Sequence, residues 1–214
     1  MIKTSLEIYN RYLIKIMMVS LIIVIPFSLF IYFSMYYMYD YLEADQYPNL
    51  YIFFIVLNFI CIVPMYRKLT TCDIDGEEEP TVWELVKVFF EHFGMILLIS
   101  LPLYIIAVVG VALAFIPTAI SGGLLLVFPF FIHDLNFKEV LRQTGSILKR
   151  ENIFIFLDLI VVASTQILIY SLLMQAFASF ESNIYVYGIM RAIVNACIFP
   201  FLIFYLTQRY SLEE

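Results

Sequence analysis

The stretch ICIVPMYRK at residues 60–68 ends a long apolar run with a proline and then two adjacent cations. The same local pattern returns in LLVFPFFIHD at residues 125–134 and in ACIFPFLIFY at residues 196–205. Pro64, Pro129 and Pro200 thus take equivalent places in three apolar segments. Repetition of such segments predicts helices that cross a membrane several times, each kinked at its proline.

The composition points the same way. The chain is 63% hydrophobic and 14% charged, whereas a soluble domain is about half apolar and a quarter charged. A soluble domain of 214 residues could not bury so much apolar surface in one core, but lipid solvates it directly. We therefore expect an all-α, multi-pass protein of the bacterial cell membrane, with residues 1–214 forming one integral membrane domain.

Six apolar segments have lengths compatible with a membrane. They are residues 14–36, 50–66, 94–115, 118–133, 153–177 and 185–206. The fourth is the shortest, and IPTAISGG before it contains Pro117, Gly122 and Gly123, which suit a tight turn. Two readings stay open for residues 118–133: a full span, or one arm of a re-entrant pair.

The distribution of cations orients these segments. All of the twelve Lys and Arg except Arg191 lie in the amino-terminal stretch, in residues 66–93 and 133–151, or in the carboxy-terminal tail. The loops at residues 37–49, 116–122 and 178–184 have none. The positive-inside rule then places both termini in the cytoplasm and requires an even number of spans, so we expect six.

The spacing of the segments indicates a threefold repeat over residues 1–68, 80–133 and 136–209. Each unit would contain an amphipathic helix on the cytoplasmic surface, then an ascending and a descending helix. In residues 81–93 the apolar stripe is Val82, Leu85, Val86, Phe89 and Phe93. In residues 136–150 the apolar stripe is Phe137, Val140, Leu141, Ile147 and Leu148, opposite Lys138, Arg142 and Lys149. Such cations would meet anionic lipid head groups.

Ionisable residues inside membrane segments are expensive and mark candidate sites. Two are present, Asp158 and Arg191, and we expect Asp158 to face Tyr205 and Arg209 across a helical hairpin. Three polar residues join them as candidates: Asn58, Gln166 and Asn195. These five either hold helices together or line a polar pathway, and the sequence leaves both roles open.

No motif for catalysis, a cofactor or a metal accompanies these residues. His92 and His133 lack the neighbours of a metal site, and the acidic segment DIDGEEE at residues 73–79 lacks the spacing of a calcium-binding loop. We expect that segment to be a solvated loop, the three cysteines to be packing residues, and nucleic acid not to be a partner.

The segment VFPFFIHDLNFKEVLRQTGSILKRENIF at residues 127–154 resembles a bacterial family, the membrane domain of some glycerophosphodiester phosphodiesterases and its stand-alone relatives. The resemblance rests on Asp134, Glu139, Arg142, Thr144, Lys149 and Asn152. It implies a six-helix membrane domain. The 214 residues contain no counterpart of the catalytic domain, so phosphodiesterase activity is not expected.

The leading hypothesis is a non-enzymatic accessory, regulatory or assembly factor that uses residues 81–93 and 136–150 to dock a cytoplasmic protein. The alternative is a membrane subunit that carries a small amphiphile or lipid, powered by a separate ATPase. An intramembrane enzyme would need converging polar groups that the sequence does not supply.

Overall fold

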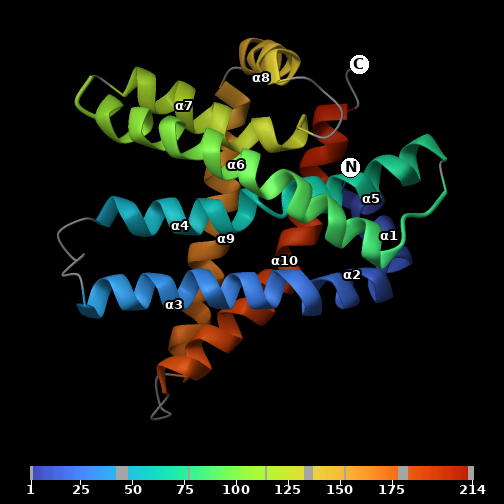
Figure 1. The fold of residues 1–214 in the computed structure, drawn as a ribbon, viewed down its shortest axis with the longest axis horizontal. Coiled ribbons are helices and arrows are strands. Elements are labelled where there is room, and N and C mark those ends of the chain that lie inside the picture. Colours follow the sequence, from blue (N-terminus) through green and yellow to red (C-terminus); the bar gives the residue numbers. More distant parts are fainter. Residues whose placement is uncertain are drawn as a thin grey trace.

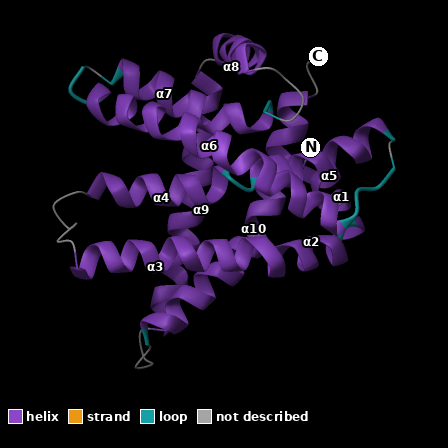
Figure 2. Cartoon of the chain, viewed as in Figure 1, coloured by secondary structure: helices purple, strands orange, loops and turns teal. Residues whose placement is uncertain are grey.

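The computed structural model describes residues 2–41, 48–76, 78–113, 115–132, 137–151, 153–177 and 183–211. Within these ranges the regular structure is helical and no strand occurs (Figure 2). The helices are α1 Ile2–Arg11, α2 Leu13–Val19, η1 Ser20–Val24, α3 Ile25–Tyr41, α4 Pro48–Ile60, α5 Val63–Asp75, α6 Val82–Gly110, α7 Ile116–Val127, η3 Phe128–Phe130, α8 Phe137–Glu151, α9 Ile153–Phe177 and α10 Ile184–Ser211. The predicted all-α class is confirmed.

Four helical stretches among the described residues are long and apolar enough to cross a membrane. They are Leu13–Tyr41, Leu50–Ile74, Val82–Gly110 and Ile184–Tyr210. Helix α9 has the bounds of the predicted fifth segment but is outside this set. The predicted fourth segment corresponds to α7, of 12 residues, and the 3₁₀ turn η3, together shorter than the roughly 20 residues of a spanning helix. The count of six spans stays a prediction.

The three proline segments meet in the centre of the molecule. Helix α5, which has Pro64 in its first turn, packs against both η3 and α10, and Pro64, Pro129 and Pro200 are all buried. Aromatic rings join the same segments: the centroids of Phe59 and Phe199 lie 5.3 Å apart in an edge-to-face arrangement. Such pairs add to the free energy gained from burying apolar area.

The three prolines do not all act as kinks. Pro64 lies in the first turn of α5, after a break at Cys61 and Ile62, where its missing N–H leaves no hydrogen bond unmade. Pro129 lies in the 3₁₀ turn that ends α7. Pro200 lies inside α10, as predicted. The regular threefold plan is therefore not seen in the helix boundaries.

The prediction of a separate surface helix over residues 81–93 was wrong, because these residues form the first turns of α6. A capping box starts α6: Thr81 Oγ1 accepts from the Glu84 N–H, and Glu84 accepts from the Thr81 N–H at 2.9 Å. No strong helix breaker follows before residue 94, so the helix runs on to Gly110. The predicted apolar stripe packs against protein: Phe89 and Phe93 lie edge-to-face against Phe27 of α3.

The turn between α6 and α7 lies earlier than predicted. Phe115 has a φ of 64°, the left-handed conformation that reverses the chain, and Pro117 stands in the first turn of α7. Gly122 and Gly123 are within α7, not in the turn. Helices α6 and α7 pack closely along the resulting hairpin.

The ends of the helices α3 to α6 lie on two opposite sides of the molecule (Figure 1). The end of α3 and the start of α4 both lie on one side, and the end of α5 and the start of α6 lie on the other, near α1. Helix α1 packs against α10, and Ser5 Oγ donates to Gln208 Oε1 at 3.3 Å. Helix α1 and the carboxy-terminal end of α10 therefore lie beside each other.

Candidate functional site

Three buried polar side chains join α3, α4 and α10. Ser28 Oγ donates to Asn58 Oδ1 at 3.1 Å, and Asn195 Nδ2 donates to Ser28 Oγ at 3.4 Å. Each of the three is at most 7% exposed. The sequence identified both asparagines but missed Ser28, because a serine in an apolar helix usually bonds its own backbone. The structure brings Asn58 and Asn195 together as a bridge between helices.

A second buried group compensates for Pro200. A proline inside a helix leaves the carbonyl four residues earlier without its N–H partner, here the carbonyl of Ala196. Ser20 Oγ, in the π-helix η1, lies 3.4 Å from that oxygen and 2.9 Å from Tyr66 Oη. The π-helix ends at Val24, two residues before Pro26, which allows the chain to accommodate that second proline. Lipid tails offer no hydrogen-bond partners to these hydroxyl and carbonyl groups. The hydrogen bonds of Ser20 therefore hold α10 to η1 and α5.

Asp158 pairs with Arg209, which confirms the prediction from the sequence. Arg209 Nη1 donates to Asp158 Oδ1, and Tyr210 Oη donates to Asp158 Oδ2 at 3.4 Å. Asp158 is 4% exposed, and the guanidinium of Arg209 also lies over the ring of Phe154 at 5.9 Å. The pair fixes α9 to the end of α10.

A cavity of about 310 Å³ opens beside this pair, between α9 and α10. Its lining is mostly apolar, and its charged groups are Asp158 and Arg209. The lining residues are Ile2, Leu157, Asp158, Val161, Phe201, Leu202, Tyr205, Leu206 and Arg209. A space with apolar walls and a few converging polar groups is typical of small-molecule sites.

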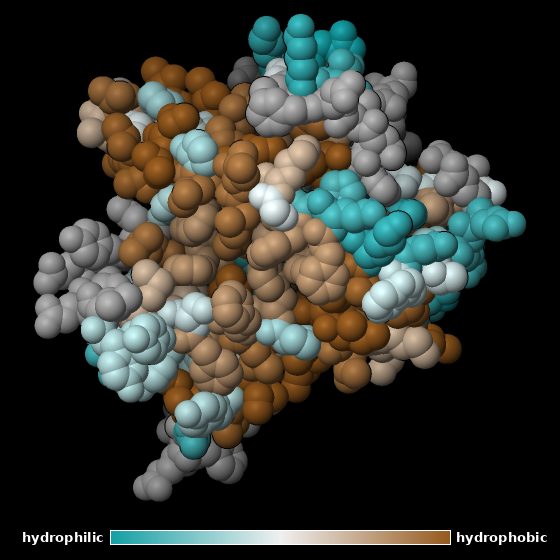
Figure 3. Space-filling model, viewed as in Figure 1, coloured by the Kyte–Doolittle hydropathy of each residue, from teal (hydrophilic) through white to brown (hydrophobic). Residues whose placement is uncertain are grey.

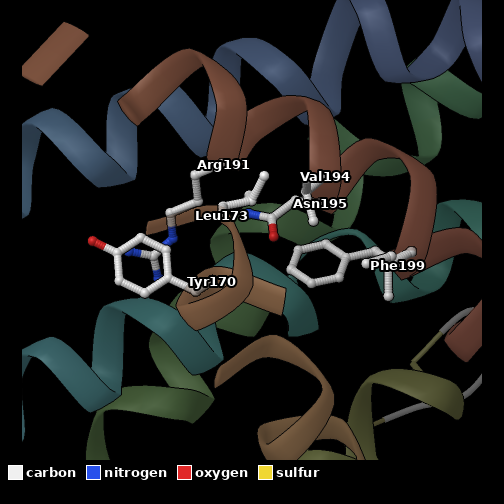
Figure 4. A pocket seen from close by; sticks show the side chains of 7 residues that line it. Tyr170, Leu173, Arg191, Val194, Asn195 and Phe199 are labelled. Carbon is white, nitrogen blue, oxygen red and sulfur yellow. The ribbon is translucent and has the colours of Figure 1, made fainter. Parts of the chain in front are cut away.

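Arg191 does not pair with Asp158. Its guanidinium lies 5.1 Å from the ring centroid of Tyr170 on α9, a cation–π contact. Arg191 and Asn195 are four residues apart and, as predicted, share a face of α10, where both line a cavity of about 20 Å³ (Figure 4). The side chain of Gln166, the fifth candidate, lies outside the described residues.

Ion pairs hold the amino-terminal helices to the acidic segment, which corrects the expectation of a purely solvated loop. Helix α5 continues through that segment to Asp75. Arg11 Nη1 donates to Asp73 Oδ1 at 2.5 Å, Tyr12 Oη donates to the same oxygen at 2.9 Å, and Lys15 Nζ lies 2.6 Å from Glu79 Oε2. Asp73 therefore joins α1 to α5, and Glu79 joins α2 to the connection between α5 and α6.

Tyr12 should make stability sensitive to high pH. Burial, and then the carboxylate of Asp73, raise the pKa of Tyr12 from 10.0 to about 12. Because the pKa of Tyr12 is higher in the folded than in the unfolded chain, the protonated tyrosine contributes to the free energy of unfolding. This contribution is complete below pH 10 and is lost as the pH rises to 12. We expect the melting temperature of Tyr12→Phe to fall less steeply than that of the wild type over this range. The control Tyr39→Phe changes an exposed tyrosine, and its melting temperature should fall with pH as steeply as that of the wild type.

Helix α8 is amphipathic, as predicted for residues 136–150. Val140, Thr144 and Ile147 are buried against the bundle, while Lys138, Arg142 and Lys149 are exposed. Hydrophilic residues gather at α8 and near the start of α6, whereas the middle of the same face is hydrophobic (Figure 3). His133, Asp134 and Asn152, at the ends of the segment that carries the family resemblance, lie outside the described residues.

Within the part of the chain that the structure describes, no group of three or more His, Cys, Asp or Glu residues lies close enough to hold a metal ion. Comparison of the chain with protein-family models, with curated proteins and with solved structures finds no match.

Proposed function

We propose that the chain is a non-enzymatic membrane protein that acts as an accessory, regulatory or assembly factor, with both termini in the cytoplasm. The exposed cationic face of α8 is the observation that carries this proposal. Lys138, Arg142 and Lys149 point away from the bundle while the opposite face is buried, so the helix is held in place and its charges are presented outward. The resemblance to the phosphodiesterase membrane domain belongs to the same proposal.

The hydrogen-bonded interior supports a structural role for most of the polar residues. Asn58 and Asn195 bond through Ser28, and the cavity beside Asn195 has room for little more than one water-sized particle. Polar side chains that satisfy one another hold helices together and leave little room for a wide aqueous pathway.

The cationic face can be tested by removing three charges. We expect the variant Lys138→Gln/Arg142→Gln/Lys149→Gln, tagged and purified in mild detergent, to lose a stoichiometric protein partner that the wild type retains. Glutamine keeps the helix propensity and a polar, unbranched side chain, so folding should be unaffected. The loss should be large because each cation would add to electrostatic attraction at a complementary surface.

The control is Lys3→Gln, which removes an exposed cation from α1 and should keep the partner. Retention of the partner by the α8 variant, or recovery of the wild type without any partner, would contradict the proposal.

The cavity of about 310 Å³ between α9 and α10 favours the second candidate function, a subunit that holds a small amphiphile. Its apolar walls suit a hydrocarbon chain, and the Asp158–Arg209 pair suits a polar head. A single lipid or small molecule that is enriched with the purified wild type and lost in Val161→Trp, which fills the cavity, would support this function over the first.

A further inference from the structure

Arg191 is a charged residue with no acidic partner in the described structure. It lies inside the membrane-compatible stretch Ile184–Tyr210, and none of the ion pairs among the described residues includes it. Asp158, the acidic residue of the α9–α10 hairpin, is already paired with Arg209. The ring of Tyr170 offsets only part of a full positive charge.

Arginine cannot remove this charge by losing a proton, because its guanidinium stays protonated in proteins. A charged group taken out of water and left without a counter-charge is strongly destabilising. Some negative charge that is not part of the described chain should therefore balance Arg191.

The space beside Arg191 fits a small anion. The cavity has a volume of about 20 Å³, and a cavity of roughly 10–15 Å³ is enough for one water-sized particle. Four apolar side chains line it, Leu173 of α9 and Val194, Ile198 and Phe199 of α10, together with Tyr170, Arg191 and Asn195.

Polar groups converge on this space. The guanidinium of Arg191 lies at one end, against the ring of Tyr170, the carboxamide of Asn195 lies in the middle, and the ring of Phe199 lies at the other end (Figure 4). Asn195 is 7% exposed and gives one of its two amide hydrogens to Ser28, which leaves the other for a bound anion. The edge of an aromatic ring is positive and also suits an anion.

We propose that Arg191 and Asn195 bind a monatomic anion of the size of chloride in the cavity between α9 and α10. The anion balances the guanidinium and joins the two helices above Pro200. This site is independent of the cationic face of α8 and of the larger cavity beside Asp158.

The binding can be measured by chloride-35 NMR on the protein in phosphatidylcholine nanodiscs, with gluconate replacing chloride at constant ionic strength. We expect saturable broadening of the chloride signal that bromide reverses by competition. Arg191→Gln should weaken binding by about tenfold or more, the usual loss for a charge-assisted hydrogen bond, and Arg191→Lys should retain part of it. Arg142→Gln, at an exposed cation of α8, should bind like the wild type.

Two results would overturn the proposal. Broadening that does not saturate in the wild type would mean that water alone occupies the cavity. Stabilisation of the wild type by phosphatidylglycerol but not by chloride would mean that a lipid phosphate balances Arg191. Both results come from the wild-type protein, so the proposal stays testable if Arg191→Gln does not fold.

Discussion

Arg209→Met should lower the free energy of unfolding by about 3–5 kcal/mol, because it removes the guanidinium that is ion-paired with the buried carboxylate of Asp158. Asp158 is 4% exposed, so water cannot replace the lost guanidinium. Tyr210, at 3.4 Å, provides one neutral hydrogen bond and cannot balance a full charge. Unfolding in dodecyl maltoside with increasing mole fractions of sodium dodecyl sulfate would measure the loss.

The double variant Asp158→Leu/Arg209→Met should recover most of this stability. Apolar residues of similar volume replace buried ion pairs with little loss, since the cost of desolvating both charges disappears with them. Arg142→Met is the matched control: Arg142 also pairs with a carboxylate, Glu139, but its side chain is 77% exposed, so the loss should be about 1 kcal/mol or less.

The same variants separate the two roles left open for Asp158. Low protein levels in Arg209→Met with normal levels in the double variant would show that the pair holds α9 to α10. Normal levels of the double variant with loss of a bound amphiphile would assign the pair to the cavity beside it. Equal stability of Arg209→Met and the wild type would contradict the ion pair itself.

Features with one local cause were predictable from the sequence. The capping box at Thr81 and the apolar stripe of α8 follow from residues within a few turns of one helix. The Asp158–Arg209 pair was also predictable, because the two ends of an antiparallel hairpin must lie side by side.

Features that depend on distant residues were not predictable. Ser28 and Ser20 become important only because α3 and η1 pack against α10, where they meet Asn195 and the carbonyl of Ala196. The fusion of residues 81–93 into α6 was missed for another reason: its apolar stripe is suited equally to a membrane surface and to the protein core, and only the position of Phe27 decides between them. The identity of a partner or ligand has no such local signature.

Gly110→Ala should destabilise the protein by about 1–3 kcal/mol, the usual cost of overpacking. A Cβ built on Gly110 would lie 2.6 Å from the backbone nitrogen of Thr118 and 2.8 Å from the side chain of Pro117. The first of these neighbours is backbone and cannot rotate away. Helices α6 and α7 would have to separate, and the hydrogen bond from Thr118 Oγ1 to the carbonyl of Ala107, at 2.6 Å, would lengthen with them.

Gly94→Ala provides the contrast on the same helix. No atom lies within 4 Å of a Cβ built on Gly94, so alanine there should raise the free energy of unfolding by about 0.5–1 kcal/mol through its better helix propensity. The two variants make the same chemical change in α6 and should shift the unfolding midpoint in opposite directions. If both stabilise the protein, then α6 and α7 do not approach closely at Gly110, and the short helix α7 must be held against the bundle by its other neighbours, α8 and α9.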